Sequence, residues 1–394
     1  MDSLTCKGFR AGGVAAGIKK NGDSDLGLLV SDRPARVAAV FTRNRVQAAP
    51  VQLDRERVKA GVARAIIVNA GNANCATGSQ GMADAVAMAC CAAQALNIPE
   101  ETILVASTGV IGAPLPIEKI RMAVPDLVMQ AHAGGIPELA RAIMTTDTRP
   151  KMVSCEGRAN GAGYRIVAIA KGAGMIRPDM ATMLCFACTD ADIDGGDLQA
   201  MLIRAVDGSF NRITIDGDTS TNDTAILMAN GASGARIAGD DERQAFQRQL
   251  NDLFVELARQ LVADGEGVTK VVDLRVKGAR CDEDAFAVAD TIAHSPLVKT
   301  AFFGEDANWG RIIAAAGRAK VFIDPDRLDL YFDDVQMVKD GRGCGAQAEA
   351  EASAVLKQDA FAVTLDLNLG SGTAELLTCD FSLDYVRINA DYRS

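Results

Sequence analysis

The sequence is poor in histidine and in aromatic residues, and each shortage excludes a class of function. The 394 residues include two histidines and one tryptophan, and aromatic residues make up 5% of the chain. So few imidazoles leave little material for a Ser-His-Asp or Cys-His catalytic site. So few aromatic rings argue against a surface that stacks nucleic-acid bases or sugars.

The sequence also lacks a basic surface, a secretory signal and a membrane span. The net charge is −10, and lysine and arginine are scattered along the chain, which excludes the basic stripe of a nucleic-acid-binding protein. The first residues have no apolar core of the kind that a signal peptide needs. The most apolar helical stretch, Ala85–Leu96, is shorter than the roughly 18 residues that span a bilayer. We therefore expect a soluble, cytoplasmic protein that binds neither nucleic acid nor membranes.

No cofactor or metal motif is present in the sequence. There is no phosphate-binding loop, and no Gly-x-Gly-x-x-Gly follows a predicted strand. Cys185 and Cys188 have the spacing of a metal or redox pair, but their apolar surroundings are typical of a strand, on which the two sulfurs face opposite sides. We expect the ten cysteines to be reduced thiols. The aspartate-rich segment 216–223 lacks the glycine and glutamate of a calcium loop and predicts a turn.

Short apolar runs alternate with helical patterns, which predicts an α/β (α+β) fold. Several runs alternate apolar and polar residues, which favours a layered sandwich of mixed or antiparallel sheets flanked by helices. No linker divides the chain, so composition predicts no structural domain boundary. The predicted strands are Leu26–Val30, Arg36–Phe41, Ala65–Asn69, Ile103–Ser107, Arg165–Ala170, Thr182–Cys188, Ala225–Met228, Val268–Val276, Ala319–Ile323, Leu328–Phe332, Phe361–Leu367 and Ala374–Cys379. The predicted helices are Met82–Leu96, Leu139–Met144, Leu198–Val206, Asp241–Ala263, Asp282–Ala293 and Ile312–Ala316.

One segment, Lys171–Leu184, offers a catalytic group that needs no histidine. It is a Gly/Pro-containing loop that leads directly into a predicted strand at Thr182, preceded by the small Ala181. The α-amine of an N-terminal threonine titrates near about 8 and can serve as the base for its own hydroxyl. An internal threonine gains such an amine only if the chain cuts itself before it. The alternative, that Thr182 is simply a β-forming residue, stays open on the residues alone.

This segment resembles the signature of the ornithine acetyltransferase family, also called glutamate N-acetyltransferase. The resemblance runs from about residue 8 to the last residue. The other segments that resemble the family, in the same order, are Asn69–Gly78, Ala106–Gly112, Met144–Thr148, Asp216–Thr224, Asp264–Lys270, Gly304–Arg311 and Asn389–Ser394.

The resemblance implies a self-cleaving enzyme with a fold like that of N-terminal-nucleophile proteins. Cleavage between Ala181 and Thr182 would give an α fragment, 1–181, and a β fragment, 182–394, which interweave. Thr182 would be the nucleophile, and Thr108 and Gly109 would form the oxyanion hole. The substrate-binding residues implied are Thr145, Lys171, Thr182, Glu266, Asn389 and Ser394.

The implied reaction moves the acetyl group of N-acetylornithine to glutamate through an acetyl ester of Thr182. No cofactor is implied, and the expected assembly is two copies of each fragment. Whether acetyl-coenzyme A is also a donor stays open. Two alternatives remain at this point: a hydrolase of the N-terminal-nucleophile class, amidase or aminopeptidase, and a non-catalytic amino acid binding protein in which Thr182 is structural. On the residues alone, Lys171 is interpreted as a solvated strand end and Glu266 as a loop charge, and their binding roles depend on the joint pattern of family-like segments.

Overall fold

The computed structural model describes residues 4–177 and 183–391, and these form two compact units. Unit 1 contains 4–211 and 218–261, and unit 2 contains 212–217 and 262–391. Thr182, Ala181 and Ser394, which the sequence analysis placed in the site, lie outside the described residues. The chain passes between the two units at 211/212, 217/218 and 261/262, and none of these points coincides with the predicted cleavage position.

Unit 1 is built on an eight-stranded mixed sheet with the strand order β4-β3-β2-β9-β7-β6-β5, and β1 pairs with β2. A separate two-stranded ribbon is formed by β8 and β10. The strands of unit 1 are β1 (Phe9–Val14), β2 (Leu26–Phe41), β3 (Val62–Asn72), β4 (Ile103–Val110), β5 (Lys151–Ala159), β6 (Ala162–Lys171), β7 (Leu184–Thr189), β8 (Asp192–Ile193), β9 (Thr224–Ala229) and β10 (Arg236–Ile237). The helices that begin in unit 1 are α1 (Ala49–Arg57), α2 (Gly78–Leu96), α3 (Ile117–Gln130), α4 (Ile136–Ala142), α5 (Gly195–Asp207) and α6 (Asp240–Ala263).

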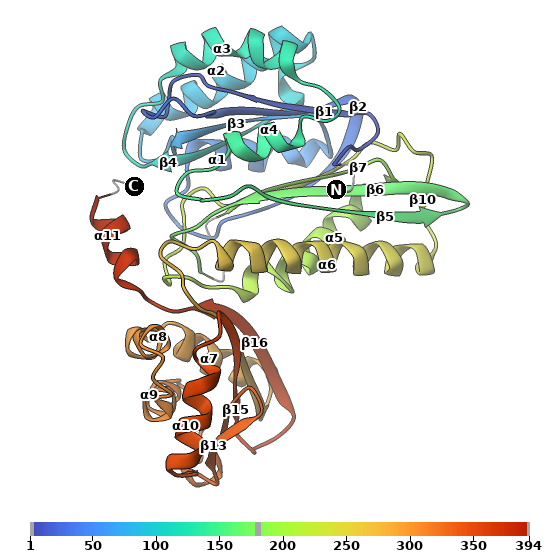
Figure 1. The fold of residues 1–394 in the computed structure, drawn as a ribbon. Coiled ribbons are helices and arrows are strands. Elements are labelled where there is room, and N and C mark those ends of the chain that lie inside the picture. The colour runs from blue at the N-terminus through green and yellow to red at the C-terminus, as the bar shows by residue number, and fades with distance from the viewer. Residues whose placement is uncertain (1–3, 178–182, 392–394) are drawn as a thin grey trace. The chain divides into compact units, whose positions relative to one another are not determined.

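The long strand β2 joins two layers of this sheet. Its first half pairs with β1 and β3, and its second half pairs with β9. In Figure 1, α2 and α3 lie outside the first layer and α5 and α6 lie outside the second. One apolar cluster includes Leu29 and Ile66 of the first layer and Phe186 and Ile226 of the second. A further cluster packs the other side of the first layer against α2 and α3. Unit 1 is thus a layered sandwich with helices on both outer faces.

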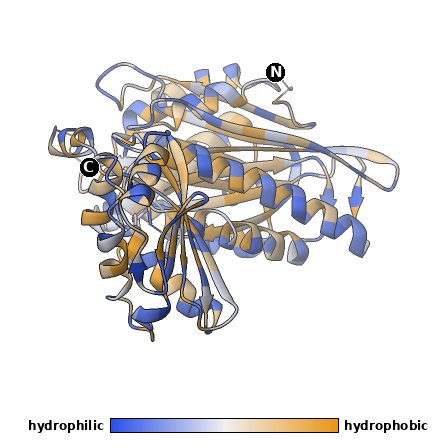
Figure 2. Cartoon of the chain, turned by 60° about the horizontal axis from the view of Figure 1, so that its bottom comes forward, coloured by the Kyte–Doolittle hydropathy of each residue, from blue (hydrophilic) through white to orange (hydrophobic). Residues whose placement is uncertain are grey.

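The helix predicted from its apolar spacing is α6. Phe246, Leu250, Phe254, Leu257 and Leu261, which recur at intervals of three and four, are all fully buried. Figure 2 shows hydrophobic and hydrophilic residues alternating along this long helix. The apolar stripe packs inward while the charged side chains face out, as expected for an amphipathic helix on a sheet.

Unit 2 has its own six-stranded sheet with the order β14-β13-β12-β15-β11-β16. The pair β11 and β15 is parallel and the other pairs are antiparallel. Its strands are β11 (Val271–Ala279), β12 (Asp329–Phe332), β13 (Val335–Lys339), β14 (Arg342–Gly343), β15 (Ala360–Asp366) and β16 (Gly372–Cys379). Its helices are α7 (Asp282–Ala293), α8 (Pro296–Phe303), α9 (Trp309–Ala316), α10 (Ala346–Val355) and α11 (Leu383–Asp391). A second core fills the space between this sheet and its helices.

The predicted fold class is confirmed, and one predicted strand is wrong. Residues 319–323 form a bend and an irregular stretch instead of a strand. Ala319, Val321 and Ile323 alternate because they pack against the core of unit 2, while Phe322 is exposed beside Arg280. The alternation thus records burial of every second side chain without a hydrogen-bonded partner strand.

Other elements differ in extent or were not predicted. The two strands predicted for 26–30 and 36–41 are one strand, β2, with an irregular register between Val30 and Ala35. In place of the predicted Thr182–Cys188, β7 begins at Leu184. The elements that were not predicted are β1, β5, β8, β10, β13, β14, α1, α3, α8, α10 and α11. Among 4–177 and 183–391, no helix combines the length and the apolar character needed to cross a bilayer.

Candidate active site

Thr108 and Gly109 lie near the end of β4, where the strand runs beside β3. Thr108 is buried. Gly109 has φ +129°, and a Cβ atom there would lie 2.4 Å from the carbonyl carbon of Gly71 and 2.6 Å from the backbone nitrogen of Asn72. Only glycine fits this conformation and this close approach. The two predicted oxyanion-hole residues therefore sit on a rigid strand end with a backbone that other residues cannot adopt.

Buried asparagines brace this strand end. Ser107 Oγ donates to Asn69 Oδ1 at 2.6 Å, and Asn69 Nδ2 donates to the carbonyl of Asn72 at 2.8 Å. Asn222, from the loop before β9, donates to the carbonyls of both Ala73 and Ser107 at 2.7 and 2.8 Å. Because buried polar groups must be paired, these amides fix the position of the backbone next to Thr108. Asn222 had no predicted role, although it lies inside Asp216–Thr224, a segment that resembles the family.

Lys171, the last residue of β6, connects two of the predicted site residues. Its Nζ donates to Thr145 Oγ1 at 2.7 Å and to Thr108 Oγ1 at 3.2 Å. The residue is 4% exposed, which excludes a solvated strand end. The structure therefore brings together Thr108, Thr145 and Lys171 from three separate segments of unit 1.

Asp147 lies beneath this group and was not predicted. Its side chain is fully buried. Oδ1 accepts hydrogen bonds from Lys151 Nζ at 2.6 Å and from the backbone N–H of Gly172 at 2.7 Å. Oδ2 accepts from the backbone N–H of Thr145 at 2.9 Å and lies 3.9 Å from Lys171 Nζ. One carboxylate thus holds two lysines and two backbone amides.

The charges around Asp147 outweigh its burial. Burial alone raises the pKa of this carboxyl, but the ammonium groups of Lys171 and Lys151, together with hydrogen bonds from Lys151 and Gly172, lower the pKa to about 2. The group is therefore a carboxylate throughout the neutral range. One sign of this residue is present in the sequence, its place in Met144–Thr148, a segment that resembles the family.

A second buried carboxyl, Asp223, lies directly before β9. Its Oδ1 accepts a hydrogen bond from the backbone N–H of Met183 at 3.1 Å. Burial raises its pKa well above the usual range, although the Met183 N–H and the charge of Lys171 act in the opposite direction. The segment 216–223, predicted to be a turn, is an irregular stretch with bends at 216, 217 and 221. Its last residue, Asp223, contacts the backbone of Met183.

Unit 2 holds the other predicted pair. Glu266, between α6 and β11, is 8% exposed, so it is not a solvated loop charge. Asn389 of α11 donates from Nδ2 to Glu266 Oε2 at 2.8 Å and to the carbonyl of Tyr385 at 3.0 Å. The loop closes tightly here, because a Cβ on Gly267 would lie 2.3 Å from the backbone nitrogen of Tyr385. A buried carboxylate beside an amide donor suits a cationic group of a ligand.

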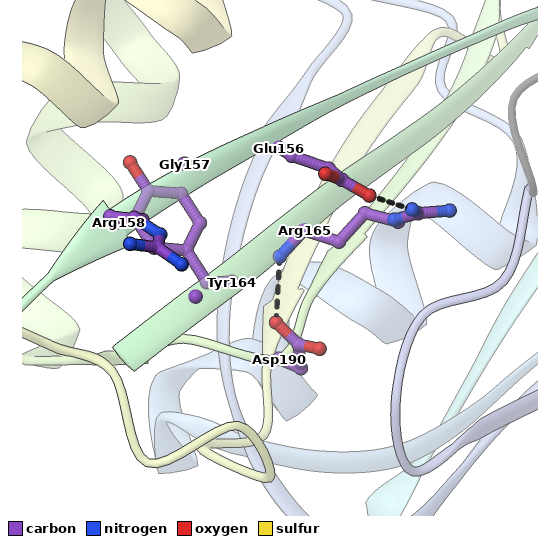
Figure 3. Close-up of a pocket in the computed structure, with 7 residues that line it drawn as sticks. Glu156, Gly157, Arg158, Tyr164, Arg165 and Asp190 are labelled. Atoms are coloured by element: carbon purple, nitrogen blue, oxygen red, sulfur yellow. Dashed lines mark hydrogen bonds and ion pairs between the residues drawn. The ribbon is translucent and has the colours of Figure 1, made fainter. Parts of the chain in front are cut away.

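A surface hollow of about 630 Å³ lies elsewhere in unit 1, on the hairpin of β5 and β6 (Figure 3). Two of its charged side chains pair with each other. Arg165 pairs with Glu156, and its backbone N–H donates to Asp190 at 2.8 Å. Tyr164 donates to Gln249 at 2.7 Å. None of the predicted site residues lines this hollow.

Comparison with known proteins gives one consistent result. The chain matches the sequence profile described as the ArgJ family over residues 10–394. It is 52% identical to the arginine biosynthesis bifunctional protein ArgJ of Geobacter sulfurreducens, with 99% of this chain and 100% of that protein covered. It is 49% identical to the protein of the same name from Syntrophotalea carbinolica, covering 98% and 99% of the two chains.

A solved structure from Mycobacterium tuberculosis, described as ornithine acetyltransferase complexed with ornithine, is 40% identical. That comparison covers 46% of this chain and 95% of the other chain, with a TM-score of 0.43.

Proposed function

This chain belongs to the ArgJ family, and we propose on that premise that it transfers the acetyl group of N-acetylornithine to glutamate, releasing ornithine. The observation that carries the proposal is the 52% identity, over the whole length, to a protein named for arginine biosynthesis. The group formed by Thr108, Thr145 and Lys171 supports it, because a buried ammonium and two hydroxyls suit a substrate with a carboxylate and an amide.

The first step of the proposed mechanism is self-cleavage. The Thr182 hydroxyl attacks the carbonyl carbon of Ala181, the amide C–N bond breaks, and an ester and a free α-amine form. Water then hydrolyses the ester and releases the carboxylate of Ala181. Pairing between β6 and β7 supports continued association of the fragments, because Lys171 pairs with Leu184 and the ladder continues to Ile166 and Thr189. We propose an assembly of two copies of each fragment.

Acetyl transfer follows in two halves. The free amine of Thr182 takes the proton of its own hydroxyl, and the oxygen attacks the acetyl carbonyl of N-acetylornithine. The C–N bond breaks, the protonated amine returns the proton to the leaving nitrogen, and ornithine departs. The amine of glutamate then attacks the acetyl ester, and N-acetylglutamate leaves while Thr182 regains its proton. Each tetrahedral intermediate carries an oxyanion.

Thr108 and Gly109 are proposed to stabilise that oxyanion through a hydroxyl and a backbone N–H. Donors held in place before the reaction need no rearrangement when charge develops, and one such donor contributes about 2.7–4 kcal/mol in comparable sites. The braced end of β4 and the constrained backbone of Gly109 support this role.

Besides Thr182, five residues are proposed to bind the amino acid substrates. Lys171 and Thr145 suit a carboxylate group, and Glu266 with Asn389 suits an ammonium group. Ser394 keeps the binding role that the family resemblance implies. The word bifunctional in the names of both relatives favours a second donor, and we propose acetyl-coenzyme A for it.

The test is an assay of purified protein with N-acetylornithine in the presence and absence of glutamate. We expect ornithine to form catalytically only when glutamate is present, with an equal amount of N-acetylglutamate. Release of acetate at the same rate without glutamate would identify a hydrolase instead. Replacing N-acetylornithine by acetyl-coenzyme A in the same assay tests the second donor.

A further inference from the structure

Two buried lysines and one buried carboxylate form the charged cluster around Asp147. Lys151 and Lys171 both lie against the same carboxylate, at 2.6 and 3.9 Å, and all three side chains are almost completely buried. Burying an ammonium without a counter-ion is unfavourable. The Asp147 carboxylate therefore offsets part of the charge of the two lysines, and one of these, Lys171, contacts both Thr108 and Thr145.

Asp147 also fixes the backbone on either side of this contact. Its two oxygens accept from the N–H of Thr145 and the N–H of Gly172, the residue after Lys171. The Thr145 hydroxyl and the Lys171 ammonium thus sit on backbone segments held by the same carboxylate. A shift of either segment would break the 2.7 Å hydrogen bond between them.

We propose that Asp147 is a positioning residue for acetyl transfer: it aligns Lys171 with Thr145 and, through its charge, keeps Lys171 a cation that binds the substrate carboxylate. The inference rests on the proposed function, which makes Lys171 a substrate-binding residue. It adds a residue that does not touch the substrate and acts through Lys171. The consequence is a dependence of substrate affinity on pH when Asp147 loses its charge.

The test uses Asp147→Asn, which keeps an oxygen acceptor and removes the charge. Two neighbouring ammonium groups then face each other, and a like charge nearby lowers the pKa of a lysine by about 1–3 units. We expect the KM for N-acetylornithine, divided by the wild-type KM at the same pH, to rise about tenfold between pH 6.5 and pH 9. This ratio cancels the ionisation of the substrate. The kcat should change much less.

A second variant separates charge from structure. In Asp147→Asn/Lys151→Met one ammonium remains, so the net charge equals that of the wild type. We expect its KM to stay within about threefold of the wild-type value and its KM ratio to be independent of pH. A merely structural role predicts the opposite, because the double variant removes more native contacts than the single variant.

Other charged groups near Lys171 need a control. Burial lowers the pKa of Lys19. The charge of Lys171 acts in the same direction, and the charges of Asp25 and Asp147 act in the opposite direction. Lys171 also acts on Asp223. Measuring each variant in a Lys19→Met background removes the titration of Lys19, and Asp223 is the same in every protein compared. Asp54→Asn, which changes another fully buried carboxyl group that accepts from the backbone N–H of Val105, should give a KM ratio that does not change with pH.

The outcomes are distinct. The role of Asp147 is overturned, while the wild type still transfers acetyl groups, by any of three results. These are a KM ratio in Asp147→Asn that does not change with pH, an equal rise of the KM ratio in Asp54→Asn, or a KM of the double variant that is no lower than that of Asp147→Asn. A wild type without transfer refutes the proposed function, and this inference with it. If Asp147→Asn does not fold, the double variant decides: a KM near wild type supports the proposal, and one raised more than about tenfold at every pH overturns it.

Discussion

The backbone N–H of Met183 donates a hydrogen bond to the carboxyl of Asp223 at 3.1 Å. Asp223 is 1% exposed, so its carboxyl group is almost completely removed from solvent. A buried carboxyl group with a raised pKa is therefore hydrogen-bonded to the residue that follows the proposed nucleophile. This contact holds the backbone N–H of Met183, one residue after the proposed nucleophile.

Replacing Asp223 by alanine should slow self-cleavage. Loss of the acceptor leaves a buried N–H unpaired, which costs about 1–3 kcal/mol; the same cost in the transition state of cleavage lowers the rate by about 5- to 160-fold. Asp223→Asn keeps an oxygen acceptor and should mature within about threefold of the wild-type rate. The measurement is a time course of fragment formation by intact mass after cell-free synthesis. Equal rates for the alanine and asparagine variants would contradict this role.

Thr182→Ala should leave the chain uncut and inactive. Without the hydroxyl there is neither an attack on the Ala181 carbonyl nor an acetyl ester. Denaturing mass spectrometry should find the full 394-residue chain, whereas active wild type should give fragments 1–181 and 182–394. Turnover by this variant, or an active wild type that starts only at its original N-terminus, would refute the mechanism.

Thr108→Val should reduce kcat and leave KM nearly unchanged. Valine keeps the shape of threonine and removes the hydroxyl, so about 2.7–4 kcal/mol of oxyanion stabilisation is lost, or about 10²–10³ in kcat. Thr145→Val is the matched control, because its hydroxyl also contacts Lys171 and should chiefly raise KM. Steady-state kinetics on both variants checks this split, and identical profiles would argue against a separate oxyanion role.

Gly109→Ala should disturb the end of β4, whereas Gly112→Ala should be tolerated. Both glycines have positive φ, +129° and +81°, so alanine introduces about 1–3 kcal/mol of backbone strain at either position. At Gly109 the new Cβ would also meet the Gly71 backbone at 2.4 Å, while nothing lies within 4 Å at Gly112. We expect a larger fall in melting temperature and in kcat for Gly109→Ala. Equal effects would show that the close approach to Gly71 is unimportant.

Asp147 should stabilise the fold above about pH 4 and stop doing so in acid. Its pKa in the folded protein is about 2 against an ordinary 3.8, so stability is present above the higher value and is lost as the pH falls through about 2. The difference corresponds to about 2 kcal/mol. The gap in unfolding free energy between wild type and Asp147→Asn, from urea titrations, should therefore shrink by about that amount between pH 6 and pH 2. A constant gap would contradict the depressed pKa.

The sequence predicted the fold class and most of the buried elements, because their patterns follow from burial. α6 is a clear example, with five apolar residues on one face. The strand predicted at Ala319–Ile323 is wrong because alternation of apolar and polar residues there reflects packing against the core without pairing to another strand. Helix α3, which contains Pro125, was not predicted because proline is expected to end a helix.

For the site, the sequence could name residues but not their contacts. The hydrogen bonds from Lys171 to Thr108 and Thr145 join residues 63 and 26 positions apart, a proximity that only tertiary structure creates. Asp147 and Asp223 were not singled out because one aspartate among many gives no sign that it is buried. Both carboxyl groups are buried away from water, and burial of a single aspartate cannot be inferred from composition or spacing.

The pairing of Lys171 with Leu184 has a consequence for how the protein survives stress. Before maturation, β6 and β7 form a hairpin within one polypeptide, so their encounter is local and independent of concentration. After the proposed cut, the same ladder joins two molecules that must find each other once separated. Dilute mature protein should then refold poorly after denaturation while uncut Thr182→Ala recovers, and the durability of the working enzyme becomes a matter of how slowly it unfolds.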